Sequence, residues 1–195
     1  MHGKRKTKLK MKKIDFFRIY EMKDPNICEE LIEYFDNNEH KFDGVIGQRE
    51  VNKDIKESVD CVLGDGKLFD DYTSYLQNMC LDYVNDYPYS AAYDPWGITE
   101  PINIQRYKPN QGFHGWHAER TTFREPSASR LLVFLTYLNN IEKEGGETEF
   151  YHQDIKIKPK RGLTIIWPAD WTFTHRGIPA KEETKYIATG WFNFQ

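Results

Sequence analysis

The apolar residues of this chain change their spacing part-way along it, from a helical period to short runs. Ile27, Leu31 and Phe35 recur at helical spacing after Asp24, which predicts a helix with Asp24 as its N-cap. A second amphipathic stripe predicts a helix over about residues 67–85. Its apolar members are Leu68, Tyr72, Tyr75, Leu76, Met79 and Tyr83. Stripes of this kind are typical of helices that pack on a core.

From residue 102 onward, the apolar residues occur in short runs that turn residues separate. The predicted strands cover residues 102–107, 131–138, 148–150, 155–157, 163–167 and 186–194, and an earlier one covers 16–20. Many short strands with regular turns predict a sandwich or a jelly-roll barrel. We therefore expect an α+β, mainly β fold in a single domain. The expected boundaries are a tail over 1–13 and a domain over 14–195, with helical support over about 14–98 and a barrel core over about 99–195.

Residues 39–66 are polar, are interrupted by glycine and show no clear period apart from a weak strand signal at 59–63. Long segments of this sort in compact domains are often lids or binding loops. We expect this one to close over a substrate.

Composition indicates a folded protein rather than a disordered one. Apolar residues make up 39% of the 195 residues and aromatic residues 15%. No apolar run has the length of about 18–20 residues that a membrane helix needs, and the N-terminus lacks the apolar stretch of a secretory signal. Cys28, Cys61 and Cys80 form no CxxC pair and are expected to be free thiols. The expected location is the cytoplasm, without membrane contact.

The charge is unevenly distributed along the chain. Residues 1–13 hold seven of the 27 basic residues and none of the 30 acidic ones, so the remainder carries a formal charge of −10. An acidic body disfavours nucleic acid as the substrate of the main domain. The basic tail could make a weak contact with nucleic acid or an acidic partner, but a solvated terminus is the simpler interpretation.

Candidate chemistry begins with His117 and Glu119, which lie two residues apart. In an extended segment such residues project from the same face, so both can reach one metal ion. His175, just after a predicted strand, supplies a third ligand. Two histidines and one carboxylate form the facial triad of non-haem iron(II) oxygenases, which leaves positions open for co-substrate and oxygen. The same three ligands would also suit a catalytic zinc ion.

Lys185 helps to distinguish these two interpretations. Strand alternation places Lys185, Ile187, Thr189 and Trp191 on one face of the last strand. A cation on the inward face of a small barrel needs an anionic partner, which an acidic ligand would supply. A second polar wall is expected from the strand at 102–107, where Asn103, Gln105 and Tyr107 share a face.

Other polar residues near the predicted metal ligands have simpler interpretations. His114 should point away from the face that His117 occupies, because the two differ in strand parity. Arg120, Arg124 and Arg130 are expected to be solvated or ion-paired rather than in contact with a substrate.

Six stretches of the C-terminal half form a specific set. They are Gln105-Arg-Tyr107-Lys-Pro, His117-Ala-Glu119, Tyr137-Leu-Asn139, Gly145-Gly-Glu-Thr148-Glu-Phe150, His175-Arg-Gly-Ile-Pro179 and Lys185-Tyr-Ile-Ala-Thr-Gly-Trp191. With this set, residues 100–195 resemble the iron(II)/2-oxoglutarate-dependent dioxygenase superfamily and, within it, the prolyl 4-hydroxylase-like group. The chain is also similar to short phage-encoded members, for which the location would be the host cytoplasm.

The resemblance implies a double-stranded β-helix that binds Fe(II) through His117, Glu119 and His175. It implies that Lys185 pairs with the far carboxylate of 2-oxoglutarate. It also implies that Tyr107 and Thr148 hydrogen-bond this co-substrate and that Trp191 lines the same pocket. Oxygen would be the oxidant and ascorbate a reductant. Glu119 differs from the family, where Asp is usual, and the segment between Tyr107 and His117 is one residue longer than the family pattern.

The implied reaction is hydroxylation of a C–H bond with release of succinate and carbon dioxide, on a prolyl residue of a peptide or protein. Three alternatives remain at this point. The same chemistry could act on a free amino acid or another small molecule. The triad could serve a metal-dependent hydrolase, which would leave Lys185 unexplained. The barrel could also be a non-catalytic binding module.

Overall fold

The computed structural model describes residues 15–47 and 50–195, so the basic tail lies outside the described residues. Two α-helices are present in the N-terminal half: α1 (Asn26–Asn37) and α2 (Lys67–Asp86). Helix α1 begins one residue later than the sequence predicts. Pro25 occupies the N-cap position, but the Asp24 carboxylate still accepts a hydrogen bond from the backbone N–H of Asn26 at 3.0 Å. Three short 3₁₀ helices follow at Pro88–Ala91, Ser127–Ser129 and Trp171–Phe173.

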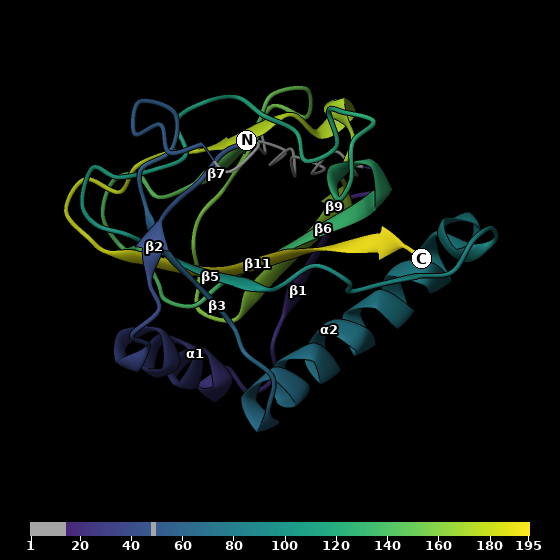
Figure 1. Ribbon diagram of the computed structural model, residues 1–195, viewed down its shortest axis with the longest axis horizontal. Helices are drawn as coiled ribbons and strands as arrows, with labels where there is room; N and C mark the ends of the chain where they lie inside the picture. The colour runs from purple at the N-terminus through teal and green to yellow at the C-terminus, as the bar shows by residue number, and fades with distance from the viewer. Residues whose placement is uncertain (1–14, 48–49) are drawn as a thin grey trace, which may run out of the picture.

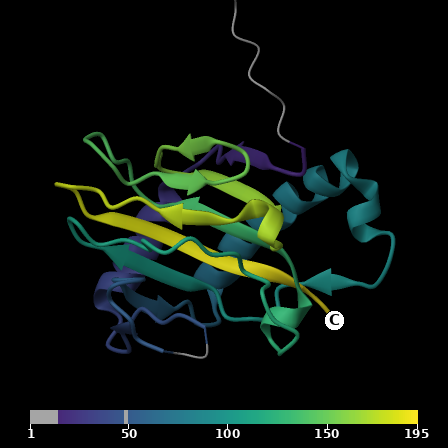
Figure 2. The same ribbon diagram turned by 90° about the horizontal axis from the view of Figure 1, so that it is seen from above.

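The large sheet contains eight antiparallel strands in the order β1-β9-β6-β11-β5-β3-β2, with β4 paired to β11. Their bounds are β1 (Arg18–Glu21), β2 (Phe42–Asp43), β3 (Val59–Val62), β4 (Trp96–Gly97), β5 (Asn103–Tyr107), β6 (Arg130–Tyr137), β9 (Leu163–Pro168) and β11 (Lys185–Phe194). The longest strand, β11, is the yellow ribbon that crosses the middle of the molecule in both views (Figures 1 and 2). Strands predicted from residue 102 onward fall within two residues of these bounds.

A second, smaller sheet has the order β10-β7-β8. Its strands are β7 (Thr148–Phe150), β8 (Ile155–Ile157) and β10 (His175–Gly177). Helices α1 and α2 lie on one side of the large sheet, and β7 lies on the opposite side (Figure 1). The large sheet therefore separates a helical layer from the small sheet.

Alternation along the central strands produces two cores, one on each face of the large sheet. On β6, Phe134 packs toward the helices, while Val133 and Leu135 belong to the cluster on the other face. On β11, Phe192 belongs to the cluster that faces the helices, and Ile187 belongs to the cluster on the other face. The helix-side cluster contains Leu31, Phe35, Tyr72, Leu76, Met79 and Tyr83, all of them buried. Apolar residues thus recur every second position in the strands and about every 3.6 positions in the helices that cover them. This confirms the predicted mainly β fold with helical support.

The prediction that all of residues 39–66 form a lid is wrong for the second half of that segment. Strand β3 pairs with β5 inside the large sheet, and Asp60 and Cys61 are buried. Asp60 forms an ion pair with Lys56 at 2.8 Å, with both side chains 5% exposed or less. A segment that supplies a sheet strand and a buried ion pair cannot swing open without breaking both.

The expectation for the cysteines is confirmed. The three cysteines are free and buried. None of the helices within the described residues is both long and apolar enough to cross a membrane.

Candidate active site

Two histidines far apart in the sequence are brought together by the backbone. His117 and His175 form an isolated antiparallel bridge, in which each N–H donates to the carbonyl of the other at 2.9 and 2.8 Å. His175 begins β10, where its ring packs against Trp167 and Phe150 with centroids 5.1 and 5.4 Å away. Phe113 stacks on the His117 ring at 3.6 Å. Both imidazoles are therefore held by their backbone and by aromatic neighbours.

The hydrogen bonds of the two rings determine which nitrogen is available. The Nδ1 atom of His117 lies 2.9 Å from the carbonyl oxygen of Gly115, and that of His175 lies 2.9 Å from the carbonyl oxygen of Phe173. A carbonyl only accepts, so each Nδ1 must carry the proton, and each Nε2 of a neutral ring keeps its lone pair. Both Nε2 atoms lie 3.5 Å from Oε1 of Glu119.

Glu119 completes a compact group of three candidate ligands. The ligand atoms of His117, Glu119 and His175 all lie within 4.8 Å of one another. Burial alone would raise the pKa of the Glu119 carboxyl, but interactions with His117 and His175 outweigh it and hold that pKa well below its ordinary value. Burial lowers the pKa of His117, and the nearby His175 lowers it further. An ionised carboxylate and a neutral imidazole are the forms of these side chains that bind a metal.

This donor set fits a divalent metal ion. Two nitrogen lone pairs and a carboxylate oxygen converge on one point, and three acceptors facing each other are unfavourable without a cation between them. Each imidazole donates its other N–H to a backbone carbonyl, as metal-ligating histidines almost always do to an oxygen acceptor. With three protein ligands, an octahedral ion would keep positions free for small molecules.

Lys185 lies at the start of β11, where it is only 3% exposed. Its Nζ donates to the carbonyl oxygen of Gly146 at 3.0 Å and lies 5.0 Å from the centre of the Tyr107 ring. Among the described residues, no carboxylate lies within salt-bridge distance of this ammonium group. Burial lowers the pKa of Lys185 to about 8, against a smaller opposing effect of Glu147. A buried cation that lacks a carboxylate partner is suited to an anionic ligand.

The Gly145-Gly146 turn provides the carbonyl that holds Lys185. Gly145 has φ +89°, and a Cβ added there would lie 2.0 Å from the carbonyl oxygen of Pro179.

We expect Gly145→Ala to lower the free energy of unfolding by roughly 2–4 kcal/mol, since both the backbone angle and the contact are unfavourable. Urea unfolding would measure the change. Gly47→Ala is the matched control: its φ is also positive, at +47°, but the added Cβ meets nothing within 4 Å. An equal loss in both variants would show that the contact with Pro179 has no effect.

Tyr107 and Thr148, both predicted to bind a co-substrate, are buried on the same side as Lys185. Tyr107 pairs with Lys185 across β5 and β11, and its hydroxyl donates to Oε1 of Gln105 at 2.7 Å. Thr148 Oγ1 accepts a hydrogen bond from the Tyr137 hydroxyl at 2.6 Å. Tyr137 lies in one of the stretches that match the family, but its residue pattern alone predicted no role for it in this wall.

Trp191 contacts a predicted metal ligand directly. Its indole Nε1 donates to Oε2 of Glu119 at 3.0 Å. Arg130 also reaches this carboxylate oxygen, at 3.4 Å, and its guanidinium lies 3.5 Å from the centre of the Trp191 ring. Sequence reasoning placed Arg130 among solvated or ion-paired residues, and it is indeed paired, with Glu100 at 2.6 Å. No sequence signal connects Glu100 to Glu119, since the two are joined only through Arg130, which contacts both.

The other candidate residues lie outside this group. The His114 backbone N–H donates to the carbonyl of Ile55, and its side chain is not among the three converging ligands. Arg120 forms an ion pair with Asp170 at 2.7 Å.

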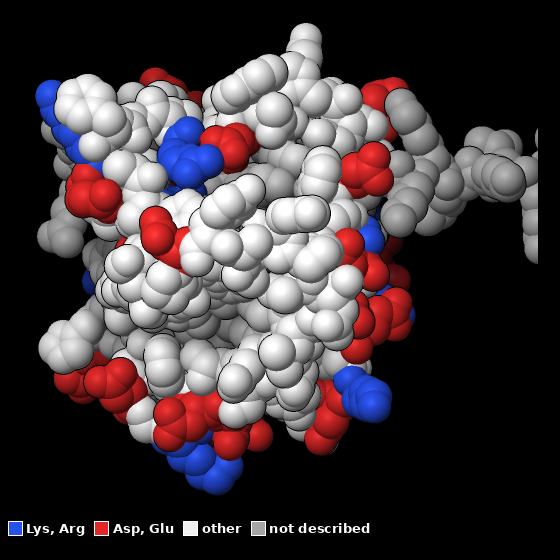
Figure 3. All heavy atoms as spheres, turned by 90° about the vertical axis from the view of Figure 1, so that its right-hand side faces the viewer, with Lys and Arg blue, Asp and Glu red and all other residues white. Residues whose placement is uncertain are grey.

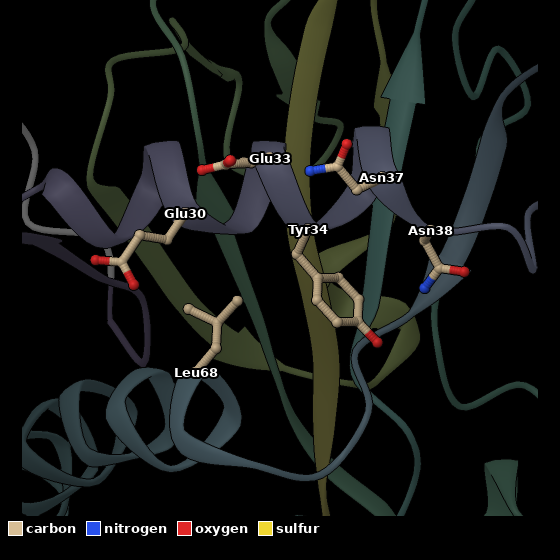
Figure 4. A pocket seen from close by; sticks show the side chains of 6 residues that line it. All are labelled: Glu30, Glu33, Tyr34, Asn37, Asn38 and Leu68. Atoms are coloured by element: carbon tan, nitrogen blue, oxygen red, sulfur yellow. The ribbon is translucent and has the colours of Figure 1, made fainter.

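A separate hollow lies between α1 and the start of α2 (Figure 4). Its lining residues are Glu30, Glu33, Tyr34, Asn37, Asn38 and Leu68. The Tyr34 hydroxyl there binds backbone atoms of Val62 and Gly64, which is a structural role. The hollow is on the helical side of the large sheet and shares no residue with the histidine pair.

Comparison with known families agrees with the geometry. Residues 102–193 match the model of the 2OG-Fe(II) oxygenase superfamily. This part of the chain is a 2OG-Fe(II) oxygenase domain. The match contains the three converging ligands, Lys185 and Trp191. The protein is accordingly a 2-oxoglutarate-dependent dioxygenase, and the cofactor and co-substrates of its family are Fe(II), 2-oxoglutarate and oxygen. A search of curated proteins found no matching relative.

Solved structures with the same fold include several prolyl hydroxylases. The viral collagen prolyl hydroxylase of Paramecium Bursaria Chlorella virus-1, in its 2OG complex, is 22% identical, covers 92% of this chain and 97% of its own, and has a TM-score of 0.67. A Pseudomonas putida prolyl-4-hydroxylase is 15% identical, with 92% and 93% covered and a TM-score of 0.69. A prolyl hydroxylase from Trichoplax adhaerens, in complex with a hypoxia inducible factor peptide fragment, is 15% identical, with 92% and 84% covered and a TM-score of 0.73. These similarities show that the oxygenase shares the jelly-roll fold of these enzymes.

Proposed function

We propose that this oxygenase hydroxylates a prolyl residue in a peptide or protein, with His117, Glu119 and His175 as the Fe(II) ligands and Lys185 as the partner of 2-oxoglutarate. The convergence of two Nε2 atoms and one carboxylate oxygen carries the proposal. The buried ammonium of Lys185, on the same side of the large sheet, supports the co-substrate assignment. A metal hydrolase would need the triad but would have no use for Lys185.

Each side chain has a defined task in this proposal. Bound Fe(II) would supply the oxidising chemistry with oxygen and 2-oxoglutarate, which leaves as succinate and carbon dioxide. Lys185 orients the co-substrate by a charge-assisted hydrogen bond to its far carboxylate. Tyr107 and Thr148 stand near it, and their hydroxyls could turn from Gln105 and Tyr137 toward that carboxylate. The apolar cluster around Ile187 keeps water away from the pocket.

Two observations favour a prolyl residue over a small molecule as the substrate. The structures described above that share this fold are prolyl hydroxylases. In addition, the metal ligands are next to exposed aromatic residues: Trp116 is 40% exposed and Tyr151 is 62% exposed, with their rings 5.2 Å apart. Trp116 precedes His117, and Tyr151 follows the strand that pairs with His175. Exposed aromatic faces of this kind, adjacent in the sequence to the metal ligands, suit proline-containing segments, which are recognised by aromatic side chains.

The charge distribution is consistent with an uncharged substrate segment. Figure 3 shows the side of the molecule where β11 ends, and the Asp and Glu side chains stand mainly at its edges. Its centre is hollowed and lined mainly by uncharged atoms. Strand pairing places Trp191 and Arg130 near this end of β11 and β6.

Anaerobic absorption spectroscopy would test the metal and co-substrate assignment. We expect a visible charge-transfer band when iron(II) and then 2-oxoglutarate are added to the metal-free protein, and no band with either alone. Folded, iron-loaded protein without a band would refute the assignment.

The substrate is tested separately, by aerobic incubation with short proline-rich peptides and with the same peptides in which alanine replaces proline. We expect succinate formation and a gain of one oxygen atom only with the proline peptides. If the charge-transfer band forms but free proline or an alanine peptide is oxidised equally well, the prolyl-peptide proposal is wrong and the oxygenase assignment stands.

A further inference from the structure

We infer that Trp191, Arg130 and Glu100 form a positioning network that fixes the Glu119 carboxylate, so that Oε1 alone faces the metal. This inference rests on the proposed role of Glu119 as a metal ligand. It assigns to Trp191 a role different from lining the co-substrate pocket, and it adds two residues, Arg130 and Glu100, that the predicted site lacks.

The two carboxylate oxygens of Glu119 have different surroundings. Oε1 lies 3.5 Å from Nε2 of both histidines. Oε2 accepts a hydrogen bond from the Trp191 indole at 3.0 Å and a longer one from Arg130 at 3.4 Å. An oxygen that already accepts two donors is held away from the metal. The carboxylate would therefore bind through one oxygen and leave a coordination position for co-substrate or oxygen.

Arg130 is itself held in place and neutralised. Its Nε and Nη2 donate to the two carboxylate oxygens of Glu100 at 2.7 and 2.6 Å, which is the strong bidentate arrangement. Glu100 also accepts a hydrogen bond from Asn193 at 2.8 Å. Because Glu100 balances the guanidinium charge, Arg130 can donate to Glu119 without adding a net positive charge beside a metal cation.

The network also holds the backbone of Glu119. Its carbonyl oxygen accepts hydrogen bonds from Ser127 at 2.8 Å and from Arg130 at 3.1 Å, and its N–H donates to Ala169 at 3.1 Å. The Arg130 guanidinium thus contacts the main chain and the side chain of the same residue while it stacks on Trp191.

A glutamate needs this support more than the aspartate that is usual in the family. Its additional methylene adds a rotatable bond, so its carboxylate can swing away from the metal or turn to bind through both oxygens. Partners of a ligating carboxylate typically change metal affinity by about 10–100-fold when they are lost. The rigid indole and the paired guanidinium restrict both movements.

Titration of the purified, metal-free protein with Co(II), followed by its visible absorption, would test the network without any turnover. We expect Trp191→Phe, which keeps the aromatic ring under Arg130 but removes the N–H, to weaken Co(II) binding by about 10-fold or more. We also expect the Co(II) band to change in intensity, because Oε2 becomes free to coordinate. A purely structural role of Trp191 would lower the melting temperature without changing this band.

Trp96→Phe is the matched control. Trp96 lies on β4 beside the end of β11. Its indole N–H donates to the carbonyl of Ser90 at 2.7 Å and not to Glu119. It should bind Co(II) within about twofold of the wild type.

Glu100→Gln gives a second, independent measurement should Trp191→Phe fold poorly. It leaves the Arg130 charge unbalanced and should also weaken Co(II) binding. Wild-type affinity and an unchanged band in both folded variants would overturn the network. Absence of Co(II) binding in the wild type would instead refute the metal site itself.

Discussion

Replacement of His175 by Ala should abolish stable Fe(II) binding and lower 2-oxoglutarate turnover on the order of 10³-fold or more, to background. His175 provides one of the two imidazole nitrogens 3.5 Å from Glu119 Oε1, and its backbone pairs with His117. Only two protein ligands would remain, and one side of the coordination sphere would be open to water.

The test combines iron content after anaerobic loading with the rate of succinate formation. His175 is 5% exposed and packs on Trp167 and Phe150, so truncation to Ala also creates a cavity. His175→Gln keeps most of the side-chain volume and separates the two effects. His40→Ala changes an exposed histidine near the end of α1 and should retain full iron content and turnover. Retention of one iron ion per chain in folded His175→Gln would contradict the assigned ligand set.

Lys185→Met should have opposite effects on co-substrate binding and on the stability of the ligand-free protein. Removal of the buried ammonium should weaken 2-oxoglutarate binding by about 100-fold, the range expected when one partner of a buried charge pair is lost. The same change should stabilise the ligand-free protein at pH 7. A methionine fills similar space and does not require desolvation of a charge.

The pH dependence follows from the lowered pKa of Lys185. Burial lowers this pKa to about 8 in the folded protein, below the ordinary value of 10.5. Below pH 8 the lysine is protonated in both states, so the full penalty of burying the charge is present. Between pH 8 and 10.5 the unfolded chain binds more protons than the folded one, so the folding free energy of the wild type becomes more favourable. The penalty is on the order of 3 kcal/mol at pH 7.

Urea unfolding of wild type and Lys185→Met at pH 7 and at pH 9.5 measures this effect. The stability gain of the variant should be large at pH 7 and should shrink at pH 9.5. Titration calorimetry of the iron-loaded proteins with 2-oxoglutarate gives the affinity. Lys185→Arg keeps the charge and should bind more tightly than Lys185→Met. Equal 2-oxoglutarate affinity in wild type and Lys185→Met would show that another residue binds the far carboxylate.

Local sequence patterns were sufficient for most of the longer elements of this fold. Helices α1 and α2 and strands β5, β6, β7, β8, β9 and β11 follow from the spacing of apolar residues, because one buried face imposes a period of 3.6 or 2 on the sequence. The short strands β2, β4 and β10 were not predicted. The grouping of His117, Glu119 and His175 could also be predicted, since parity places the first two on one face and a third ligand was needed to make a metal site. Lys185 stood out because a charge shares a face with apolar residues of the last strand.

The segment at 39–66 was harder to interpret from its residues. Its strand β3 pairs with β5, whose residues lie more than forty positions later. Such pairing depends on a distant partner strand and leaves only a weak alternation in the segment itself. Lys56 and Asp60 look like ordinary surface charges in the sequence, because their burial also depends on this distant strand pairing.

The sequence by itself determined the arrangement of helices before strands, the acidic body of the protein and the residues of the candidate metal site. Only the tertiary structure decided how that site is supported. The proton positions of the two imidazoles depend on the carbonyls of Gly115 and Phe173. The orientation of Glu119 depends on Trp191, Arg130 and Glu100, which come from three separate parts of the chain. Periodicity records which face of an element a residue occupies, whereas hydrogen bonds between distant segments depend on the register in which the strands finally pair.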